Sequence, residues 1–275
     1  MVENPLKKYF RQPKIYISLP SKGVYNKLGS TQGDLTNMPV YGMTGMDEIL
    51  MKTPDALITG ESTVKVMESC CPYIKDGWEV SSLDSDLIFA AIRIATYGNV
   101  MNLTHTCTKC NTETDFDFSL NKFIDHWQAA IFQNKITIDD LTVIIRPLTF
   151  KESNSISLKN FEIQKKLQQV MGVEDEEEQK KLVKEILFEM SELQNSVFSL
   201  SVEAVETPAG RVEEPEFIRE WLANCDTALF TTLKKQFETN RENMNVPPQP
   251  VTCSSCGHED QVAVTLDQAN FFVNA

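Results

Sequence analysis

Two segments of this chain, 146 residues apart, share the same cysteine spacing and a similar order of residues behind the cysteines. In each segment two cysteines stand three positions apart and are followed by a stretch in which apolar and polar residues alternate, the pattern of a β-strand. The first segment is Cys107-Thr-Lys-Cys110 with Glu113, Phe116, Phe118, Leu120 and Asn121, and the second is Cys253-Ser-Ser-Cys256 with Glu259, Val262, Val264, Leu266 and Asp267. The repeat predicts two equivalent β units, each built on a turn that carries two thiols.

A turn with two thiols supplies two ligands to a metal ion, whereas a structural zinc ion takes four ligands in a tetrahedral arrangement. Two such turns therefore predict one shared site, and paired C-x-x-C segments are a specific signal for it. The four predicted zinc ligands are Cys107, Cys110, Cys253 and Cys256. With every position filled by a thiolate, no position is open to water or substrate, so the zinc ion is expected to be structural. We refer to each C-x-x-C turn with its strands as a knuckle.

Other interpretations of these cysteines stay open at this stage. The two turns could carry free thiols, or one of them could be a redox pair. A thioredoxin-like pair begins a helix, however, and here a strand pattern follows both pairs, which disfavours redox chemistry. His105 and His258 stand near the cysteines, so either histidine is an alternative ligand in place of a cysteine. The remaining cysteines, Cys70, Cys71 and Cys225, lie in apolar helical patterns and are expected to be buried thiols.

Net charge and hydropathy limit the partners and the compartment. The formal net charge is −13, and an acidic chain repels phosphate backbones, so we expect no nucleic-acid partner. No apolar run approaches the ~18 residues that a membrane span needs, and the first residues lack the apolar core of a signal peptide. We therefore expect no membrane contact and a cytoplasmic location. An odd number of cysteines, seven, fits a reducing compartment better than a set of disulfides.

None of the common catalytic motifs is present in the sequence. There is no phosphate-binding G-x-x-x-x-G-K-[ST] loop, no G-x-S-x-G elbow and no H-E-x-x-H helix. Three histidines leave few general bases. The chain is therefore expected not to be an enzyme. A hydrolase with an unrecognised site is the competing hypothesis, and a cleft with convergent polar groups would favour it.

The sequence predicts an α+β fold: a mostly helical body with an extended N-terminal arm and a small zinc-ribbon-like β module. The predicted segments are an arm (1–45), a helical segment (46–99), the first knuckle (100–120), a mainly helical body with a hairpin near 135–146 (121–245), and a linker with the second knuckle (246–275).

Local signals refine this division. Ser82 or Asp84 is expected to cap a helix that ends at Gly98, and Thr149 with Glu152 has the capping-box pattern. A turn at Asp139-Asp140 is expected to close the hairpin, a small turn at Pro208–Gly210 is expected between two helices, and Val246–Pro250 is expected to be a stiff linker.

The N-terminal arm carries basic and aromatic residues on an otherwise acidic chain. Residues 1–35 hold six basic and two acidic side chains, and Lys7-Lys8-Tyr9-Phe10-Arg11 is the densest cluster. Such an arm is expected to dock on a protein partner and to contribute little to the fold. The alternation of Lys14–Leu19 allows a second interpretation, in which Ile15, Ile17 and Leu19 form a strand of the domain itself.

Several stretches resemble the baseplate hub proteins of T-even-type contractile-tailed phages, the small hub subunit family. They are Asn4-Pro-Leu6, Arg11-Gln-Pro-Lys-Ile15, Leu19-Pro-Ser-Lys-Gly23, Met43-Thr44, Asp47-Glu48, Lys52-Thr-Pro-Asp-Ala-Leu57, Ser69-Cys70-Cys71-Pro72 and Ile92-Arg-Ile-Ala-Thr-Tyr-Gly98. The resemblance covers residues 4–120 well and is weaker beyond them.

The resemblance implies a structural or assembly protein, without catalytic residues, that acts by contacts with other baseplate hub or tail proteins in the cytoplasm of the infected host. It leaves open whether the chain stays in the virion or forms a homo-oligomer. The alternative function is a zinc-ribbon regulator that binds nucleic acid or a nucleic-acid enzyme. Ribbons of that kind are usually basic, whereas residues 111–121 and 257–267 contain no lysine or arginine.

Overall fold

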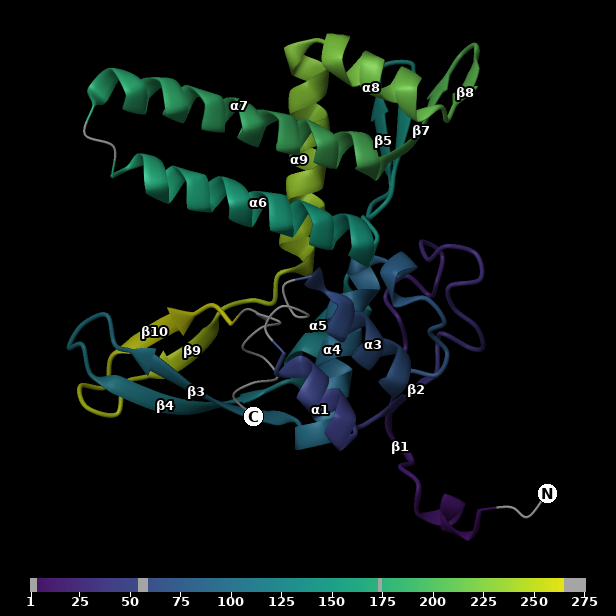
Figure 1. The fold of residues 1–275 in the computed structure, drawn as a ribbon, viewed down its shortest axis with the longest axis vertical. Helices are drawn as coiled ribbons and strands as arrows, with labels where there is room; N and C mark the ends of the chain where they lie inside the picture. Colours follow the sequence, from purple (N-terminus) through teal and green to yellow (C-terminus); the bar gives the residue numbers. More distant parts are fainter. Residues whose placement is uncertain (1–3, 54–58, 173–174, 265–275) are drawn as a thin grey trace. The chain divides into compact units, whose positions relative to one another are not determined.

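The computed structural model describes residues 4–53, 59–172 and 175–264, and it has an α+β fold (Figure 1). The described residues contain helices and small antiparallel sheets, which confirms the predicted fold class. Two compact units are present: residues 1–131 with 243–275, and residues 132–242. Leu266 and Asp267 of the repeat, and residues 54–57 of the phage resemblance, lie outside the described residues.

Helix α4 (Ser82–Tyr97) packs on α3 (Glu61–Cys70) in the first unit, and α3 in turn packs on α1 (Gly45–Met51). In α4, Leu87, Ile88 and Ile92 are fully buried. The expectation that Ser82 or Asp84 caps this helix is wrong, because the Ser81 side chain accepts the cap hydrogen bond from the N–H of Leu83. Asp84 points instead into the unit and accepts hydrogen bonds from the N–H and hydroxyl of Ser21.

Strands β1 (Pro13–Ile17) and β2 (Met38–Tyr41) form an antiparallel pair in the first unit. Ile17, Leu19, Met38 and Val40 are each 2% exposed or less, so this pair belongs to the apolar core. Of the two interpretations of Lys14–Leu19, the structure therefore favours the strand of the domain itself.

Residues 4–10, which precede Arg11, are all exposed. The short helix η1 (Pro5–Tyr9) has no buried residue, and Leu6, Tyr9 and Phe10 are 56–73% exposed. Arg11 attaches this segment, because its guanidinium donates to the carbonyl oxygens of Gly42 and Ser69 at 2.6 Å each.

The second unit contains a four-stranded antiparallel sheet in the order β5-β6-β7-β8. Its strands are β5 (Lys135–Ile138), β6 (Leu141–Ile145), β7 (Val202–Thr207) and β8 (Gly210–Val212). The predicted hairpin is present, with Asp139 at φ 51° in its turn. Strands β7 and β8 were not predicted, since only a turn between helices was expected near Pro208–Gly210.

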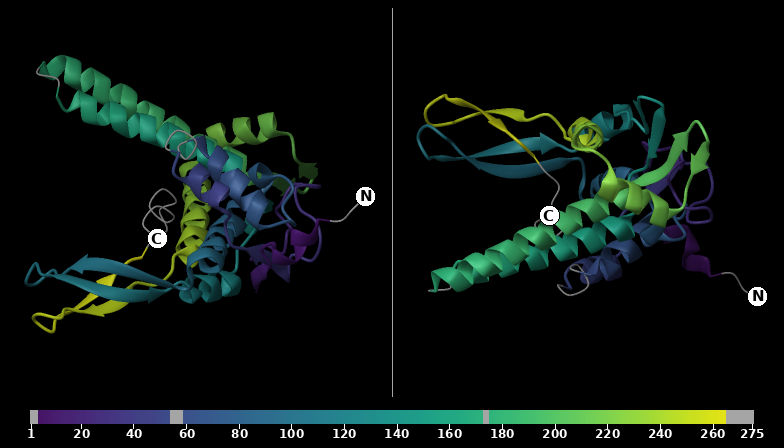
Figure 2. Two further views of the ribbon diagram at one scale, coloured as in Figure 1. Left: turned by 60° about the horizontal axis from the view of Figure 1, so that its bottom comes forward. Right: turned by 90° about the horizontal axis from the view of Figure 1, so that it is seen from above.

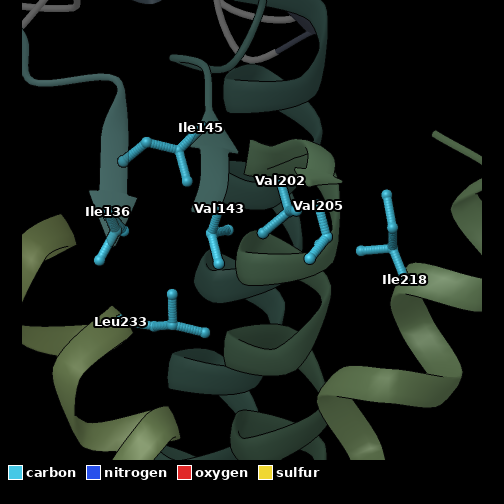
Figure 3. Packing of buried hydrophobic residues seen from close by; sticks show 7 residues of the cluster. All are labelled: Ile136, Val143, Ile145, Val202, Val205, Ile218 and Leu233. Atoms are coloured by element: carbon cyan, nitrogen blue, oxygen red, sulfur yellow. The ribbon is translucent and has the colours of Figure 1, made fainter. Parts of the chain in front are cut away.

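Helices α8 (Pro215–Asn224) and α9 (Thr227–Met244) pack on this sheet. Figure 3 shows the resulting core, in which side chains from three strands meet one residue from each helix. The seven buried residues are Ile136, Val143, Ile145, Val202, Val205, Ile218 and Leu233.

Helices α6 (Phe150–Val170) and α7 (Glu176–Ser201) form a long antiparallel pair, shown in Figure 2. The predicted capping box at Thr149 and Glu152 is confirmed, with both side-chain-to-backbone hydrogen bonds in place. A narrow seam of Ile163, Val170 and Ile186 joins the two helices. Within the described chain, no helix is both long enough and apolar enough to cross a membrane.

The two knuckles are separate antiparallel ribbons that lie side by side in Figures 1 and 2. Strands β3 (Val100–Thr106) and β4 (Glu113–Ser119) form the first, and β9 (Gln249–Thr252) and β10 (Glu259–Val262) form the second. The predicted linker Val246–Pro250 overlaps β9, because Gln249 and Pro250 pair with Val262 and Gln261. A two-stranded ribbon tolerates proline, since half of its N–H groups face away from the partner strand.

Candidate metal centre

The turn of the first knuckle is closed by two backbone hydrogen bonds around Cys107. The N–H of Cys107 donates to the carbonyl of Thr112 at 3.0 Å, and the N–H of Asn111 donates to the carbonyl of Cys107 at 3.0 Å. Asn111 has a φ of 56°, a left-handed conformation that asparagine tolerates better than most residues. The turn spans Cys107–Thr112 and contains both thiols of the C-x-x-C pair.

The second knuckle has the same two hydrogen bonds at the positions 146 residues later. The N–H of Cys253 donates to the carbonyl of His258 at 2.8 Å, and the N–H of Gly257 donates to the carbonyl of Cys253 at 3.0 Å. Gly257 has a φ of 68° and is the counterpart of Asn111. The match in sequence is therefore also a match in backbone conformation.

The structure brings the four predicted cysteines together, with their sulfur atoms all within 4.8 Å of one another. Cys107 Sγ lies 3.8 Å from Cys256 Sγ, and Cys110 Sγ lies 3.6 Å from Cys253 Sγ. A tetrahedral zinc ion with Zn–S bonds of about 2.3 Å needs sulfur atoms roughly 3.8 Å apart. The separation of the thiols therefore fits a four-coordinate metal ion, and this group of residues could bind one.

The thiols differ in their exposure and in their pKa values. Cys107 and Cys253 are buried, while Cys110 and Cys256 are more exposed. Backbone N–H groups of Cys256 and Ser255 lower the pKa of Cys253 to about 6. The hydroxyl and N–H of Thr112 lower the pKa of Cys110. A lowered pKa favours the thiolate of Cys253 and Cys110, and thiolates are the form that binds metal ions.

Cys256 behaves in the opposite way. The N–H of His258 lowers the pKa of Cys256, but the nearby thiols of Cys110, Cys253 and Cys107, together with burial, outweigh this effect and raise the pKa to about 12. A cation at the centre of the four thiols would favour the thiolate form of each of them.

Both nearby histidines contact Asp260 rather than the sulfur cluster. His105 Nε2 lies 3.0 Å from one carboxylate oxygen of Asp260, and His258 Nε2 lies 3.5 Å from the other. Among the described residues, the potential metal-binding group contains the four cysteines and neither histidine.

Asp260 connects the two knuckles and was not predicted as a site residue. It lies on β10, and its side chain is 9% exposed. The N–H of Thr108 donates to it at 3.2 Å, and the Thr108 hydroxyl donates to its other oxygen. These bonds and the contact with His105 hold the pKa of Asp260 well below its usual range. No sequence pattern marks an aspartate whose partners lie more than 150 residues away.

The three cysteines outside the cluster have different environments. Cys70 and Cys71 are fully buried, as predicted, and burial raises the pKa of Cys70 to about 12. The prediction is wrong for Cys225, which is partly exposed because it stands at the end of α8.

The model of one protein family, described as "T4 bacteriophage base plate protein", matches residues 44–273. This range covers most of the chain and includes all four clustered cysteines. The chain belongs to this family of T4-type phage baseplate proteins. The resemblance stated from the sequence is thereby confirmed at the level of the baseplate, and a structural role in the phage tail follows from it. Neither the curated proteins nor the solved structures compared with the chain give a match.

Proposed function

We propose that this baseplate protein is a non-enzymatic component or assembly factor of the baseplate hub. In this proposal it is made in the host cytoplasm and acts through contacts with other hub or tail proteins. The observation that carries the proposal is the family match over residues 44–273, which supports a baseplate protein. The narrower assignment to the hub rests on the stretches of residues 4–120 that resemble hub proteins.

We further propose that the four cysteines bind one structural zinc ion. Zinc accepts four thiolates in a closed tetrahedral site, and the 3.6 and 3.8 Å sulfur separations support that geometry. An ion held in this way connects β3 and β4 to the ribbon near the other end of the chain. Its role is to stabilise a surface for assembly, because a closed site leaves no position for a substrate.

The segment before Arg11 is the proposed contact for a protein partner. Tyr9 and Phe10 are 73% and 56% exposed, and exposed aromatic side chains are typical anchors of protein interfaces. Nucleic acid is a poorer partner, because exposed Glu113, Asp115 and Asp117 follow one another along one face of β4.

Two measurements test the proposal. Elemental analysis of the purified chain is expected to give zinc, and co-purification from infected cells is expected to recover hub proteins. Mass spectrometry of purified virions then decides between a retained component and a released assembly factor. Recovery of baseplate proteins from outside the hub would contradict the hub assignment, and a chain purified without zinc under reducing conditions would contradict the metal assignment.

A further inference from the structure

The two knuckles contact each other through crossed pairs of residues beside the sulfur cluster. Thr108 directly follows Cys107 in the first knuckle, and it bonds to Asp260 in the second. The repeat relates each residue of one knuckle to the residue 146 positions away in the other knuckle. The counterpart of Thr108 is Ser254, and the counterpart of Asp260 is Thr114. These residues also meet, because Thr114 Oγ1 lies 3.4 Å from both the N and the Oγ of Ser254. The knuckles are thus related by an approximate internal two-fold symmetry.

The two crossed contacts differ in strength because only one of them contains a carboxylate. Asp260 accepts a backbone N–H and a hydroxyl hydrogen bond and also contacts His105, so three groups of the first knuckle converge on it. Hydrogen bonds to an ionised carboxylate are roughly twice as strong as those between neutral groups. The equivalent contact of Thr114 is longer and neutral. Asp260 therefore supplies most of the polar attraction between the two turns.

We propose that Asp260 is a positioning residue that holds the two C-x-x-C turns together before a metal ion binds. In this proposal the contacts of Asp260, and not the metal ion alone, keep the four thiols within 4.8 Å of one another. Many small zinc modules behave differently, because their ligands come together only when the metal binds. This inference rests on the proposed zinc function, but it concerns the metal-free chain and is tested there.

Disulfide mapping in the metal-free, full-length chain reports which thiols are neighbours. The chain is stripped with a chelator under reducing conditions, freed of reductant and treated briefly with diamide. Diamide takes two electrons and two protons from two thiols and becomes the hydrazine. With the turns held together, we expect the crossed pairs Cys107–Cys256 and Cys110–Cys253. In Asp260→Ala the turns separate, and we expect Cys107–Cys110 and Cys253–Cys256. The ratio of crossed to local pairs is expected to be at least about tenfold lower, the factor that loss of one hydrogen bond to a charged group gives.

Matched variants separate positioning from general damage. Glu259→Ala removes the neighbouring exposed carboxylate on β10 and is expected to keep the crossed pairs. Thr108→Val removes the hydroxyl donor from the opposite knuckle and is expected to act in the same direction as Asp260→Ala. If Asp260→Ala fails to fold, as judged by circular dichroism, Thr108→Val replaces it as the test variant, because Thr108 is exposed.

Zinc affinity provides a second measurement. Losing a residue that orients metal ligands costs about 10–100-fold in affinity, so Asp260→Ala is expected to raise the zinc dissociation constant by that factor. If the wild-type chain binds zinc but both variants keep crossed disulfides and full affinity, the positioning role is wrong and the zinc function stands. If the wild-type chain forms crossed pairs that Asp260→Ala loses, but binds no zinc, the zinc function fails and the positioning role stands. Crossed pairs formed between two chains would overturn the positioning role.

Discussion

Cys110 Sγ lies 3.6 Å from Cys253 Sγ, so the second thiol of one knuckle meets the first thiol of the other. The symmetric pair, Cys107 and Cys256, is separated by 3.8 Å. Each knuckle thus contributes one buried and one more exposed thiol to the cluster. Because each knuckle supplies two of the four cysteines, loss of a cysteine from either knuckle is expected to weaken metal binding to the same extent.

The first prediction compares Cys107→Ser with Cys253→Ser. Both variants remove a buried thiol from an equivalent position, so both are expected to weaken zinc binding strongly and to a similar extent. Competition with a chromophoric chelator measures the two affinities, and Cys225→Ser is the control outside the cluster. A chain in which Cys253→Ser kept its zinc affinity while Cys107→Ser lost it would show that the knuckles do not share an ion.

The second prediction concerns stoichiometry and metal removal. One zinc ion per chain is expected by elemental analysis, since the four thiols form one group. A metal ion that binds the folded chain but not the unfolded chain stabilises the folded state. Chelation is therefore expected to lower the melting temperature of the unit that contains the knuckles. Hydrogen exchange is expected to rise in β3, β4, β9 and β10 and to stay unchanged in β5 to β8. Two zinc ions per chain, or uniform exchange changes, would contradict this prediction.

The features predicted correctly from the sequence depend on residues close together in the chain. Thr149 and Glu152 form a capping box because each side chain reaches the other residue's N–H within one helical turn. The turns at Cys107 and Cys253 likewise involve only six residues each. That the two turns lie together in the fold was predicted from coordination chemistry alone, because each turn supplies two ligands and a structural zinc ion takes four.

The features that were missed depend on distant partners. Strand β7 pairs with β6, whose residues are about 60 positions earlier, and helices α6 and α7 separate the two strands. Its Val202–Thr207 stretch continues directly from a helix, so no breaker marks its start. In the sequence Asp260 looks like any other strand residue, because its partner Thr108 lies close to it only in the folded chain. Sequence patterns report local periodicity, and they carry no direct signal for such pairings.

The third prediction separates binding from folding at the N-terminus. Deleting residues 1–9 removes the exposed η1 segment and leaves Arg11 in place, so the melting temperature is expected to change by no more than a few degrees. Co-purification with hub proteins is expected to be lost. Deleting residues 1–20 also removes Ile17 and Leu19, which are 2% and 1% exposed. At about 1.5–3 kcal/mol for each buried side chain, that deletion is expected to be severely destabilising.

Thermal melting and pull-down assays of the two deletions measure the difference. The internal control is a full-length Tyr9→Ala, Phe10→Ala variant, which removes the exposed aromatic side chains without shortening the chain. It is expected to melt like the full-length chain and to bind like the shorter deletion. Equal melting temperatures for the two deletions would mean that β1 adds nothing to stability, in conflict with its buried side chains.

The fourth prediction is a pH dependence at the start of α6. Burial acts to raise the pKa of Glu152, but hydrogen bonds from Arg146 and from the N–H of Thr149 outweigh it and hold the pKa below its ordinary value of 4.5. The Arg146 guanidinium donates to both carboxylate oxygens at 2.8 Å. A carboxyl group with a lowered pKa in the folded state stabilises the fold fully above its unfolded pKa. This contribution is lost as the pH falls through the folded pKa.

Glu152→Gln isolates this contribution, because glutamine cannot ionise and keeps the shape of the side chain. The variant is expected to lose about 1–2 kcal/mol of unfolding free energy at neutral pH, the range for a helix cap joined to a charge-assisted bond. The difference from wild type is expected to shrink as the pH falls below 4.5 and to vanish below the folded pKa. Urea unfolding across this pH range measures it. Glu162→Gln, at an exposed position of the same helix, is the control and is expected to stay near wild type throughout. A constant difference for Glu152→Gln at every pH would mean that packing, and not the ion pair with Arg146, accounts for its effect.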